Sequence, residues 1–339
     1  MSATLSVLIV GAGAVGQVYG HHLARGGARV TFYVRERYRD EVARGFTMIR
    51  LRGKRRREVS RFEGFDVVTS AAEVAGRRFD QVYLTIPSTG LAGPWLPALV
   101  AAMGDATLVA MTPSPGDADI ILASGVASDR IVPGLITLIS YHAPLPGEPA
   151  DMPDGMAYWF PPGSHAMFSG PKHRAEAVVA ALRAGGQPAK QIADVPRQVA
   201  FPNAVFQAFL VALEGAGWSL ADLRRGPQLE LGVAGAREAL AIAALSAGKP
   251  PLAIRMFVRA WILRIALRVI PHLMPLPLET YLRAHFTKVG AQTRQAMSTL
   301  IHRGRAATIP VARLEQLLAS VPELPTASTA PIVARLGRS

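Results

Sequence analysis

The chain has 339 residues, of which half are apolar and 18% are charged, and it contains no cysteine. Such a composition is typical of a globular protein with ample core, and it excludes disulfides, thiolate catalysis and cysteine-ligated metals. The net charge of +13 suggests nucleic acid, but apart from Arg50–Arg57 and residues 255–268 the basic residues are dispersed. Because no nucleic-acid-binding signature is present, we expect no nucleic-acid partner. The first residues lack the basic region of a signal peptide, so we expect a cytoplasmic protein.

The N-terminal part alternates strand-like and helix-like segments. Five β-rich runs are Leu5–Val10, Arg29–Val34, Asp80–Ile86, Ala106–Met111 and Ile131–Ile139. A helical segment, Val15–Arg25, follows the first run, and such alternation predicts βαβ units in a parallel sheet. Gly45–Leu51 and Arg57–Val68 flank a polar turn and predict a hairpin-like excursion.

The second half of the chain is predicted to be mainly helical. Residues 140–165 are rich in Pro and Gly and are expected to be loop or extended structure, followed by a helix over Ala175–Ala184. Four later segments carry helical periodicity, namely Val205–Leu223, Leu229–Ala247, Leu252–Ile270 and Leu278–His302. We therefore predict an α/β fold with a Rossmann-type domain over residues 1–185 and a helical substrate or dimerisation domain over 186–339.

A glycine motif joins the first predicted strand to the first helix. Gly11, Gly13 and Gly16 form G-x-G-x-x-G, in which the first permits a tight turn and the second lets the backbone approach a pyrophosphate. The third lets helix and strand pack closely, and the N–H groups of the helix start, including Ala14 and Val15, are available to phosphates. The motif predicts a dinucleotide site; the alternative is a glycine-rich turn without a ligand.

The end of the second strand indicates which dinucleotide is preferred. Sites for NAD usually place an acidic residue here, whereas this chain has Arg35, followed by Glu36 and Arg37. A guanidinium suits a 2′-phosphate, so we predict NADP(H); the alternative is a surface charge.

Several segments resemble the ketopantoate reductase (2-dehydropantoate 2-reductase) family. The resemblance rests on the glycine loop, the strand end Val34-Arg35, Gly45–Ile49, Asp80–Ser88, and Met297 followed seven residues later by Gly304-Arg305. It implies a Rossmann domain followed by a helical domain arranged as in 6-phosphogluconate dehydrogenase. It also implies a cleft between the domains, in which NADPH delivers hydride to the 2-oxo group of ketopantoate.

The family's catalytic positions are altered in this chain, which identifies it as a divergent member. The family carries a Lys four residues before an Asn; Asn203 matches the Asn, but the earlier position is Val199. A valine can neither donate a proton nor stabilise negative charge. Pro202 predicts that a helix starts or kinks at this point.

Other family positions are also replaced. The family's Asn-Gly, phosphate-side Lys, Ser pair and substrate-binding acid correspond here to Thr112-Pro113, Pro87, Gln295-Ala296 and Thr308. We therefore expect that ketopantoate is not the substrate. Asn203 is retained as the candidate catalytic residue and Thr112 as a candidate cofactor contact.

Reduction of a carbonyl or imine needs a proton donor or a cation near the reacting atom. The candidates are Tyr141, His142, Lys190, Arg197 and Arg294, each of which is otherwise a solvated or structurally bonded side chain. A further group comprises His302, Arg303 and Arg305, which form either an anion site or a surface cluster. The chain has no metal-ligand or serine-hydrolase motif, so we expect no metal site.

Residues 252–275 carry a stripe of arginines. Arg255, Arg259, Arg264 and Arg268 recur at intervals that place them roughly on one helical face, among apolar residues. The segment is too interrupted by charge to span a bilayer. It either lies on an anionic membrane or apolar partner, or packs within the helical domain or a homodimer interface, which we favour.

These features lead to one main hypothesis and one alternative. The first is an NADPH-dependent oxidoreductase that reduces a C=O or C=N group of a small-molecule substrate. The alternative is a non-catalytic NADP(H)-binding sensor or scaffold, in a soluble or membrane-associated form.

Overall fold

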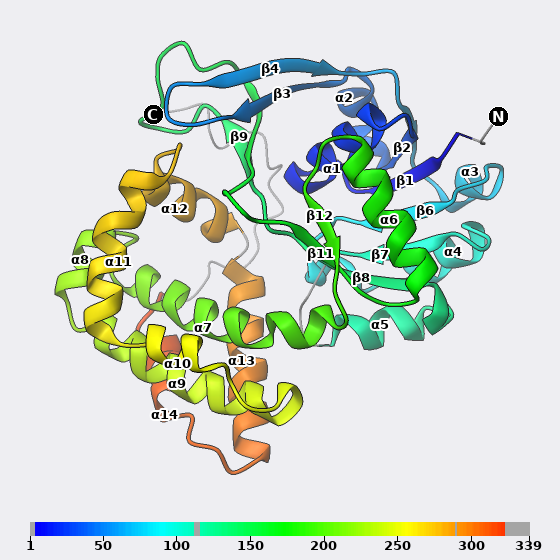
Figure 1. Cartoon of the computed structure of the whole chain (residues 1–339). Helices are drawn as coiled ribbons and strands as arrows, with labels where there is room; N and C mark the ends of the chain where they lie inside the picture. The colour runs from blue at the N-terminus through cyan, green and yellow to red at the C-terminus, as the bar shows by residue number, and fades with distance from the viewer. Residues whose placement is uncertain (1–3, 112–115, 289, 323–339) are drawn as a thin grey trace.

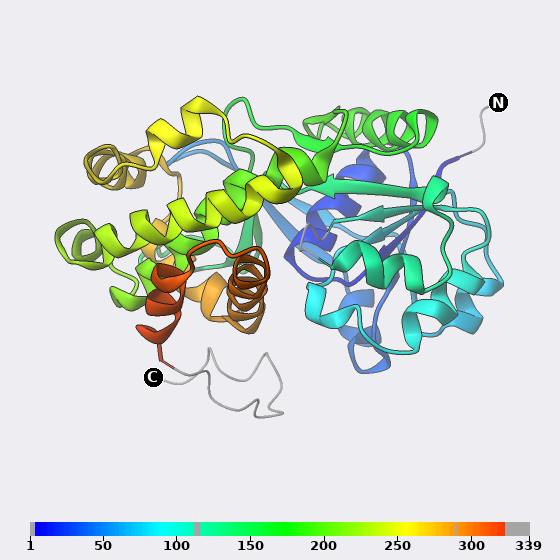
Figure 2. The same ribbon diagram turned by 90° about the horizontal axis from the view of Figure 1, so that it is seen from below.

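The structure is a computed structural model that describes residues 4–111, 116–288 and 290–322. It consists of a part built around a large sheet and a mainly helical part, which lie side by side (Figures 1 and 2). The α/β fold predicted from the sequence is confirmed.

The larger sheet has eight strands in the order β12-β11-β8-β7-β6-β1-β2-β5. The strands are β1 Ser6–Val10, β2 Arg29–Tyr33, β5 Asp66–Val68, β6 Gln81–Leu84, β7 Thr107–Ala110, β8 Ile131–Leu135, β11 Ala166–Phe168 and β12 Ala189–Gln191. All pairs from β5 to β8 are parallel, and β11 runs antiparallel to β8. The chain order therefore reverses at β1, where open parallel sheets bind their ligands.

Helices cover both faces of this sheet, which explains why its central strands are apolar throughout. One face is covered by α1 Ala14–Arg25 and α6 Lys172–Ala184, and the other by α3 Ala71–Ala75, α4 Trp95–Ala102 and α5 Asp117–Ala123. Along β1, Val7 and Ile9 pack in the first layer, whereas Leu8 and Val10 pack in the second. The short helix α2 Arg39–Ala43 and the single turns Glu36–Tyr38, Ser88–Gly90 and Ser128–Arg130 complete this part.

A second sheet, of order β4-β3-β10-β9, extends from the first part toward α12 (Figure 1). Its strands are β3 Phe46–Leu51, β4 Arg57–Phe62, β9 Ile139–Ala143 and β10 Gly155–Trp159. The β3–β4 hairpin was predicted, but Arg57–Val68 and Ile131–Ile139 each divide into two strands of different sheets. Residues 140–165 were expected to be loop or extended structure; the extended parts are the end of β9 and all of β10, which pairs with distant β3 as well as with β9.

The helical part is built around the pair α7 Val195–Gly215 and α9 Gln228–Ala247, whose close approach depends on Gly232. The remaining helices are α8 Leu220–Arg225, α10 Leu252–Phe257, α11 Ala260–Leu273, α12 Leu278–Lys288, α13 Gly290–Ala306 and α14 Ala312–Ala319. The sequence thus predicted helical character correctly but merged α7 with α8, α10 with α11 and α12 with α13.

Helix α7 begins earlier than its proline suggested. Asp194 caps it, its Oδ1 accepting a hydrogen bond from the Arg197 N–H at 3.0 Å, and the helix continues through Pro202. The expectation that a helix starts at Pro202 was therefore wrong, because α7 already begins at Val195. The buried residues Val199, Phe201 and Ala204 on both sides of the proline explain why packing prevails over the lost backbone bond.

Candidate functional site

The glycine loop lies at the carboxyl end of β1, at the point where the strand order reverses. The Gly11 N–H donates to the Tyr33 carbonyl at 3.0 Å, which ties the loop to β2. Gly11 has φ of +96°, and a Cβ there would lie 2.7 Å from Cγ2 of Ile86. Both the backbone conformation and the space therefore require glycine at this position.

Thr85 holds the same loop from the neighbouring strand. Its N–H donates to the Val10 carbonyl at 3.1 Å, and its hydroxyl lies 2.8 Å from the Val10 carbonyl oxygen and 3.0 Å from that of Gly11. Sequence reasoning missed Thr85, although its place directly after a buried strand beside β1 was a usable signal. The loop is thus fixed before any ligand arrives.

Gly16 sets how closely α1 approaches the loop. A Cβ at Gly16 would lie 2.1 Å from the Gly11 carbonyl oxygen and 2.8 Å from the Thr85 hydroxyl. The first of these neighbours is backbone and cannot rotate away.

Replacing Gly16 with Ala is therefore expected to lower the free energy of unfolding by about 3 kcal/mol. Gly13→Ala is the matched control, because a Cβ at Gly13 meets no atom within 4 Å. Urea unfolding curves of the two variants measure the difference. Equal stability of the two would contradict the close contact at Gly16.

Gly13 leaves open space above the start of α1. It is exposed and occupies the N-cap position, where no side chain caps the helix, and the first turn holds no acidic residue. The N–H groups of Ala14, Val15 and Gly16 have no partners within the helix, and the helix dipole adds positive potential. These observations fit a pyrophosphate group resting on Gly13 and the helix start.

Arg35 follows the end of β2 and is exposed. Within the part of the chain that the structure describes, its guanidinium makes no ion pair. Glu36, the residue that could accept ribose hydroxyls, is instead bonded to Thr69 and to Arg39, whose Nε lies 2.9 Å from its carboxylate. These bonds, that from Thr69 first, lower the pKa of Glu36 and keep it ionised. The basic residue is thus available to a ligand, while the acidic one is already bound.

A polar contact beside the glycine loop joins the sheet-containing part of the molecule to the helical part. The hydroxyl of Ser88, just after β6, donates to the buried carboxylate of Asp117 at 2.7 Å, and the Gln292 amide on α13 donates to Ser88 at 3.4 Å. Helix α13 therefore lies against the carboxyl edge of the sheet. No sequence signal pointed to this contact, because it depends on packing between residues about 200 positions apart. Thr112, the predicted cofactor contact, lies outside the described residues.

The candidate catalytic residue Asn203 lies on α7, one turn after Val199. Asn203 is half-buried, and its Oδ1 accepts a hydrogen bond from Gln207 at 3.5 Å, whereas Val199 is buried. At the position where the family has its Lys, this chain thus has a buried valine that packs in the protein interior.

The other candidates are dispersed. Arg294 makes a two-armed ion pair with Glu214, at 2.8 and 3.0 Å, and Arg197 donates to the Ala247 carbonyl at 3.2 Å. Both arginines therefore link helices. Lys190 lies on β12.

Tyr141 and His142 alternate across β9. Tyr141 is buried and donates to Glu148, and burial raises its pKa well above the usual range. His142 is exposed, 3.8 Å from Asp154. Because its pKa is raised and its hydroxyl is bonded to Glu148, Tyr141 keeps its proton in the folded protein.

The C-terminal cluster is also engaged. Arg303 donates to Ser246 at 3.3 Å, Arg305 pairs with Glu315 at 2.6 Å, and His302 is exposed. The structure thus places a glycine loop held by Thr85 and the exposed cation Arg35 at the carboxyl ends of β1 and β2.

Comparison with known proteins agrees with this architecture. Residues 7–140 match the family model described as ketopantoate reductase PanE/ApbA. No curated protein matches the chain significantly.

Solved structures share the fold over nearly the whole chain at low identity. A PanE/ApbA family ketopantoate reductase from Ralstonia eutropha JMP134 superposes with a TM-score of 0.69 at 19% identity, covering 93% of this chain and 96% of the other. A 2-dehydropantoate 2-reductase from Methylococcus capsulatus gives 0.65 at 18% identity, covering 93% and 95%. D-mandelate dehydrogenase in ternary complex with NADH and anilino(oxo)acetate gives 0.67 at 13% identity, covering 93% and 96%. Residues 7–140 thus match the ketopantoate reductase PanE/ApbA model, and the whole chain shares the fold of these solved reductases.

Proposed function

We propose that the protein is an NADPH-dependent oxidoreductase that reduces a C=O or C=N group of a small molecule other than ketopantoate. The observation that carries the proposal is the open space over Gly13 at the uncapped start of α1, fixed by Gly11 and Thr85. The superposed D-mandelate dehydrogenase is an oxidoreductase holding NADH. A second support is the exposed Arg35 beside a carboxylate that is already bonded.

Each residue of the site has a definable task in this proposal. The N–H groups of Ala14, Val15 and Gly16 hold the pyrophosphate, and Arg35 pairs with the 2′-phosphate. The bound dinucleotide supplies the hydride. Asn203, half-buried on α7, donates a hydrogen bond to the heteroatom of the substrate, and solvent water supplies the proton that this heteroatom takes up. Val199 gives no proton, so the replaced lysine excludes the family's own proton route.

Turnover is tested by following NADPH absorbance with a panel of 2-oxo acids, ketones and imines. We expect oxidation with at least one class, and loss of it when Asn203 is replaced by Ala. Ketopantoate serves as the comparison substrate, with which we expect little or no turnover. Faster turnover with ketopantoate than with every other compound would contradict the substrate proposal.

Arg35→Ala is expected to weaken NADPH binding about 10- to 100-fold and to leave NADH binding unchanged, since only NADPH carries the 2′-phosphate. Fluorescence titration with both cofactors measures the change. Arg29→Ala is the matched control, because Arg29 is an exposed arginine at the opposite end of the same strand. Equal losses for NADPH and NADH would contradict a role for Arg35 in phosphate recognition.

The second candidate function is a non-catalytic NADP(H)-binding sensor or scaffold. The burial of Val199, one turn before Asn203, favours it, because the usual proton donor is replaced by an apolar side chain. NADPH binding that persists while the whole substrate panel remains inert would support this candidate over the reductase.

A further inference from the structure

Helix α11 exposes a ridge of large apolar side chains. Trp261, Ile265, Val269 and Leu273 follow one another at a spacing of four and are 58%, 57%, 45% and 71% exposed. On a helix, this spacing places them on one face. Of the fourteen residues of α11, Leu263 is the buried one, packed in the core of the helical part. The apolar surface of α11 therefore extends well beyond the side that packs against the rest of the protein.

The preceding helix extends this surface. In α10, Leu252 is 70% exposed, and Met256 and Phe257 are also exposed. No described residue of α10 is fully buried. We call the exposed side chains of α10 and α11 the ridge face. Contiguous apolar surface of this kind marks a place of interaction.

Cations accompany the ridge face. Arg255, Arg259, Arg264 and Arg268 are all exposed, and between Lys249 and Leu278 the sequence has no Asp or Glu. Within the described residues, Arg264 alone of these four has an ion pair, with Glu230 at 2.8 Å. Residues 252–273, which the structure divides into α10 and α11 with Arg259 between them, thus combine an apolar ridge with four arginines, of which Arg264 alone has an ion pair among the described residues.

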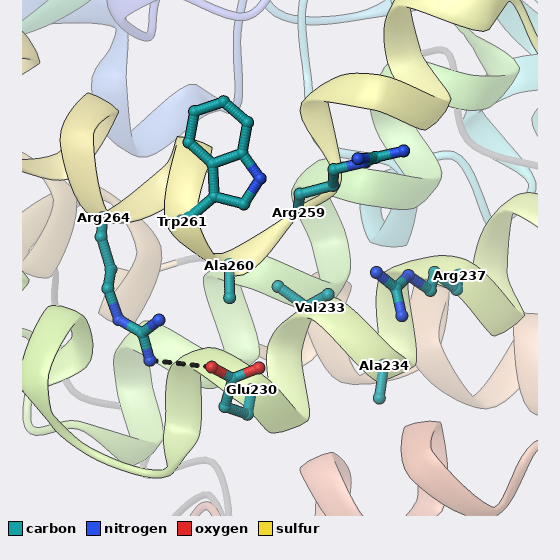
Figure 3. Close-up of a pocket in the computed structure, with 8 residues that line it drawn as sticks. All are labelled: Glu230, Val233, Ala234, Arg237, Arg259, Ala260, Trp261 and Arg264. Carbon is teal, nitrogen blue, oxygen red and sulfur yellow. Dashed lines mark hydrogen bonds and ion pairs between the residues drawn. The ribbon is translucent and has the colours of Figure 1, made fainter.

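A pocket of about 580 Å³ lies beside the ridge face, between α9 and α11. Figure 3 shows Arg237 and Arg259 at one side of it, the Arg264–Glu230 pair at the other, and Trp261 above an apolar floor. Apolar walls with guanidinium groups at the rim suit the junction between a phosphate headgroup and an acyl chain.

The charge of this surface indicates its partner. A second copy docking through the same face would set these arginines against their counterparts, which is unfavourable. An anionic lipid surface instead receives the apolar side chains at the acyl boundary and the arginines at the phosphates. None of the described helices is long and apolar enough to cross a bilayer alone. Helices α11 and α12 are long and apolar enough only together, and the chain bends by 101° between them.

We propose that the ridge face docks this protein on the surface of an anionic lipid bilayer, with α10 and α11 lying in the interface. Trp261, Ile265, Val269 and Leu273 enter the acyl boundary, while Arg259 and Arg268 contact phosphates. Helix α11 lies away from the glycine loop, on the far side of the helical part (Figures 1 and 2). Docking therefore leaves the nucleotide site accessible and is independent of the proposed reductase function.

The test is flotation of the full chain with phosphatidylcholine vesicles that contain or lack phosphatidylserine. We expect binding to the anionic vesicles at least tenfold stronger than to the neutral ones, and weaker binding at high salt. Ile265→Glu with Leu273→Glu, and separately Arg259→Glu with Arg268→Glu, should each reduce binding at least tenfold. All these side chains are exposed, so each variant should retain the melting temperature and NADPH affinity of the parent.

Matched controls come from the sheet part. Leu122→Glu replaces an exposed apolar residue on α5, and Arg78→Glu an exposed arginine, so both should bind vesicles as the parent does. The proposal is overturned if the parent ignores anionic vesicles, or if ridge-face variants and controls lose binding equally. It is also overturned if light scattering shows a dimer that the ridge-face variants dissociate while vesicles are not bound.

Discussion

Replacing Gly13 with Asp is expected to weaken NADPH binding by two to three orders of magnitude and to leave the fold intact. The fold is preserved because a Cβ at Gly13 meets nothing within 4 Å, and Gly13 has the extended backbone that an N-cap residue adopts. The new carboxylate would bond the same helix N–H groups that the pyrophosphate needs. Two like unit charges 4 Å apart repel by about 4 kcal/mol near a protein surface, roughly a thousandfold in affinity.

Gly13→Asn separates charge from size, since Asn also caps helices but carries no charge. Its loss of affinity should be clearly smaller than that of Gly13→Asp. Gly76→Asp is the control for an added carboxylate at another open glycine, and should bind NADPH as the parent does. Fluorescence titration gives the affinities, and thermal unfolding confirms the fold. Undiminished NADPH binding by Gly13→Asp would place the pyrophosphate elsewhere.

The free energy of unfolding is expected to fall steeply as the pH drops from about 6.5 to about 4. His21 and His22 on α1 are buried among Phe62, Tyr158 and Phe160. Burial first, and for His21 the charges of Arg25 and Arg50 next, lower the pKa of each histidine to about 4.

In this window the unfolded chain binds protons that the folded chain does not, so acid favours unfolding. Each histidine accounts for about 3 kcal/mol across the whole window. In neutral His22 the proton lies on Nδ1, because Nδ1 is 2.7 Å from the Gly185 carbonyl oxygen, which can only accept a hydrogen bond.

Urea unfolding between pH 7.5 and 4.5 measures this dependence. His21→Phe, which places an apolar ring among aromatic neighbours, should flatten the pH dependence by about 3 kcal/mol. His142→Gln, which removes an exposed histidine on β9, is the comparison variant. An identical slope in the parent and in His21→Phe would contradict the buried, neutral state of His21.

The strand, glycine loop and helix at the start of the chain could be predicted because their determinants are local. Gly11, Gly13 and Gly16 stand within six residues, between a buried strand and an amphipathic helix, so their roles follow from their spacing. The position of Arg35 just after the next strand could be predicted for the same reason.

The parts that the sequence did not predict depend on distant partners. Strand β10 pairs with β3, about a hundred residues earlier, so the sequence alone left its Pro- and Gly-rich segment open between loop and extended structure. The contact of Ser88 with Gln292 exists only because α13 packs against the sheet edge. The start of α7 was missed because Asp194 caps the helix eight residues before Pro202.

The arginine stripe illustrates a different limit. Its spacing was visible in the sequence, but its relation to burial was not. The structure shows that Leu263 faces the core while Ile265 and Val269 remain exposed, which favours an external partner over simple packing within the helical part.

Fluorescence titration of the unmodified chain with NADPH and with NADH tests the proposed cofactor site most directly. We expect saturable binding of NADPH, tighter than that of NADH, because in the proposed site the 2′-phosphate meets Arg35 and the pyrophosphate meets the start of α1. Failure of both cofactors to bind would contradict it.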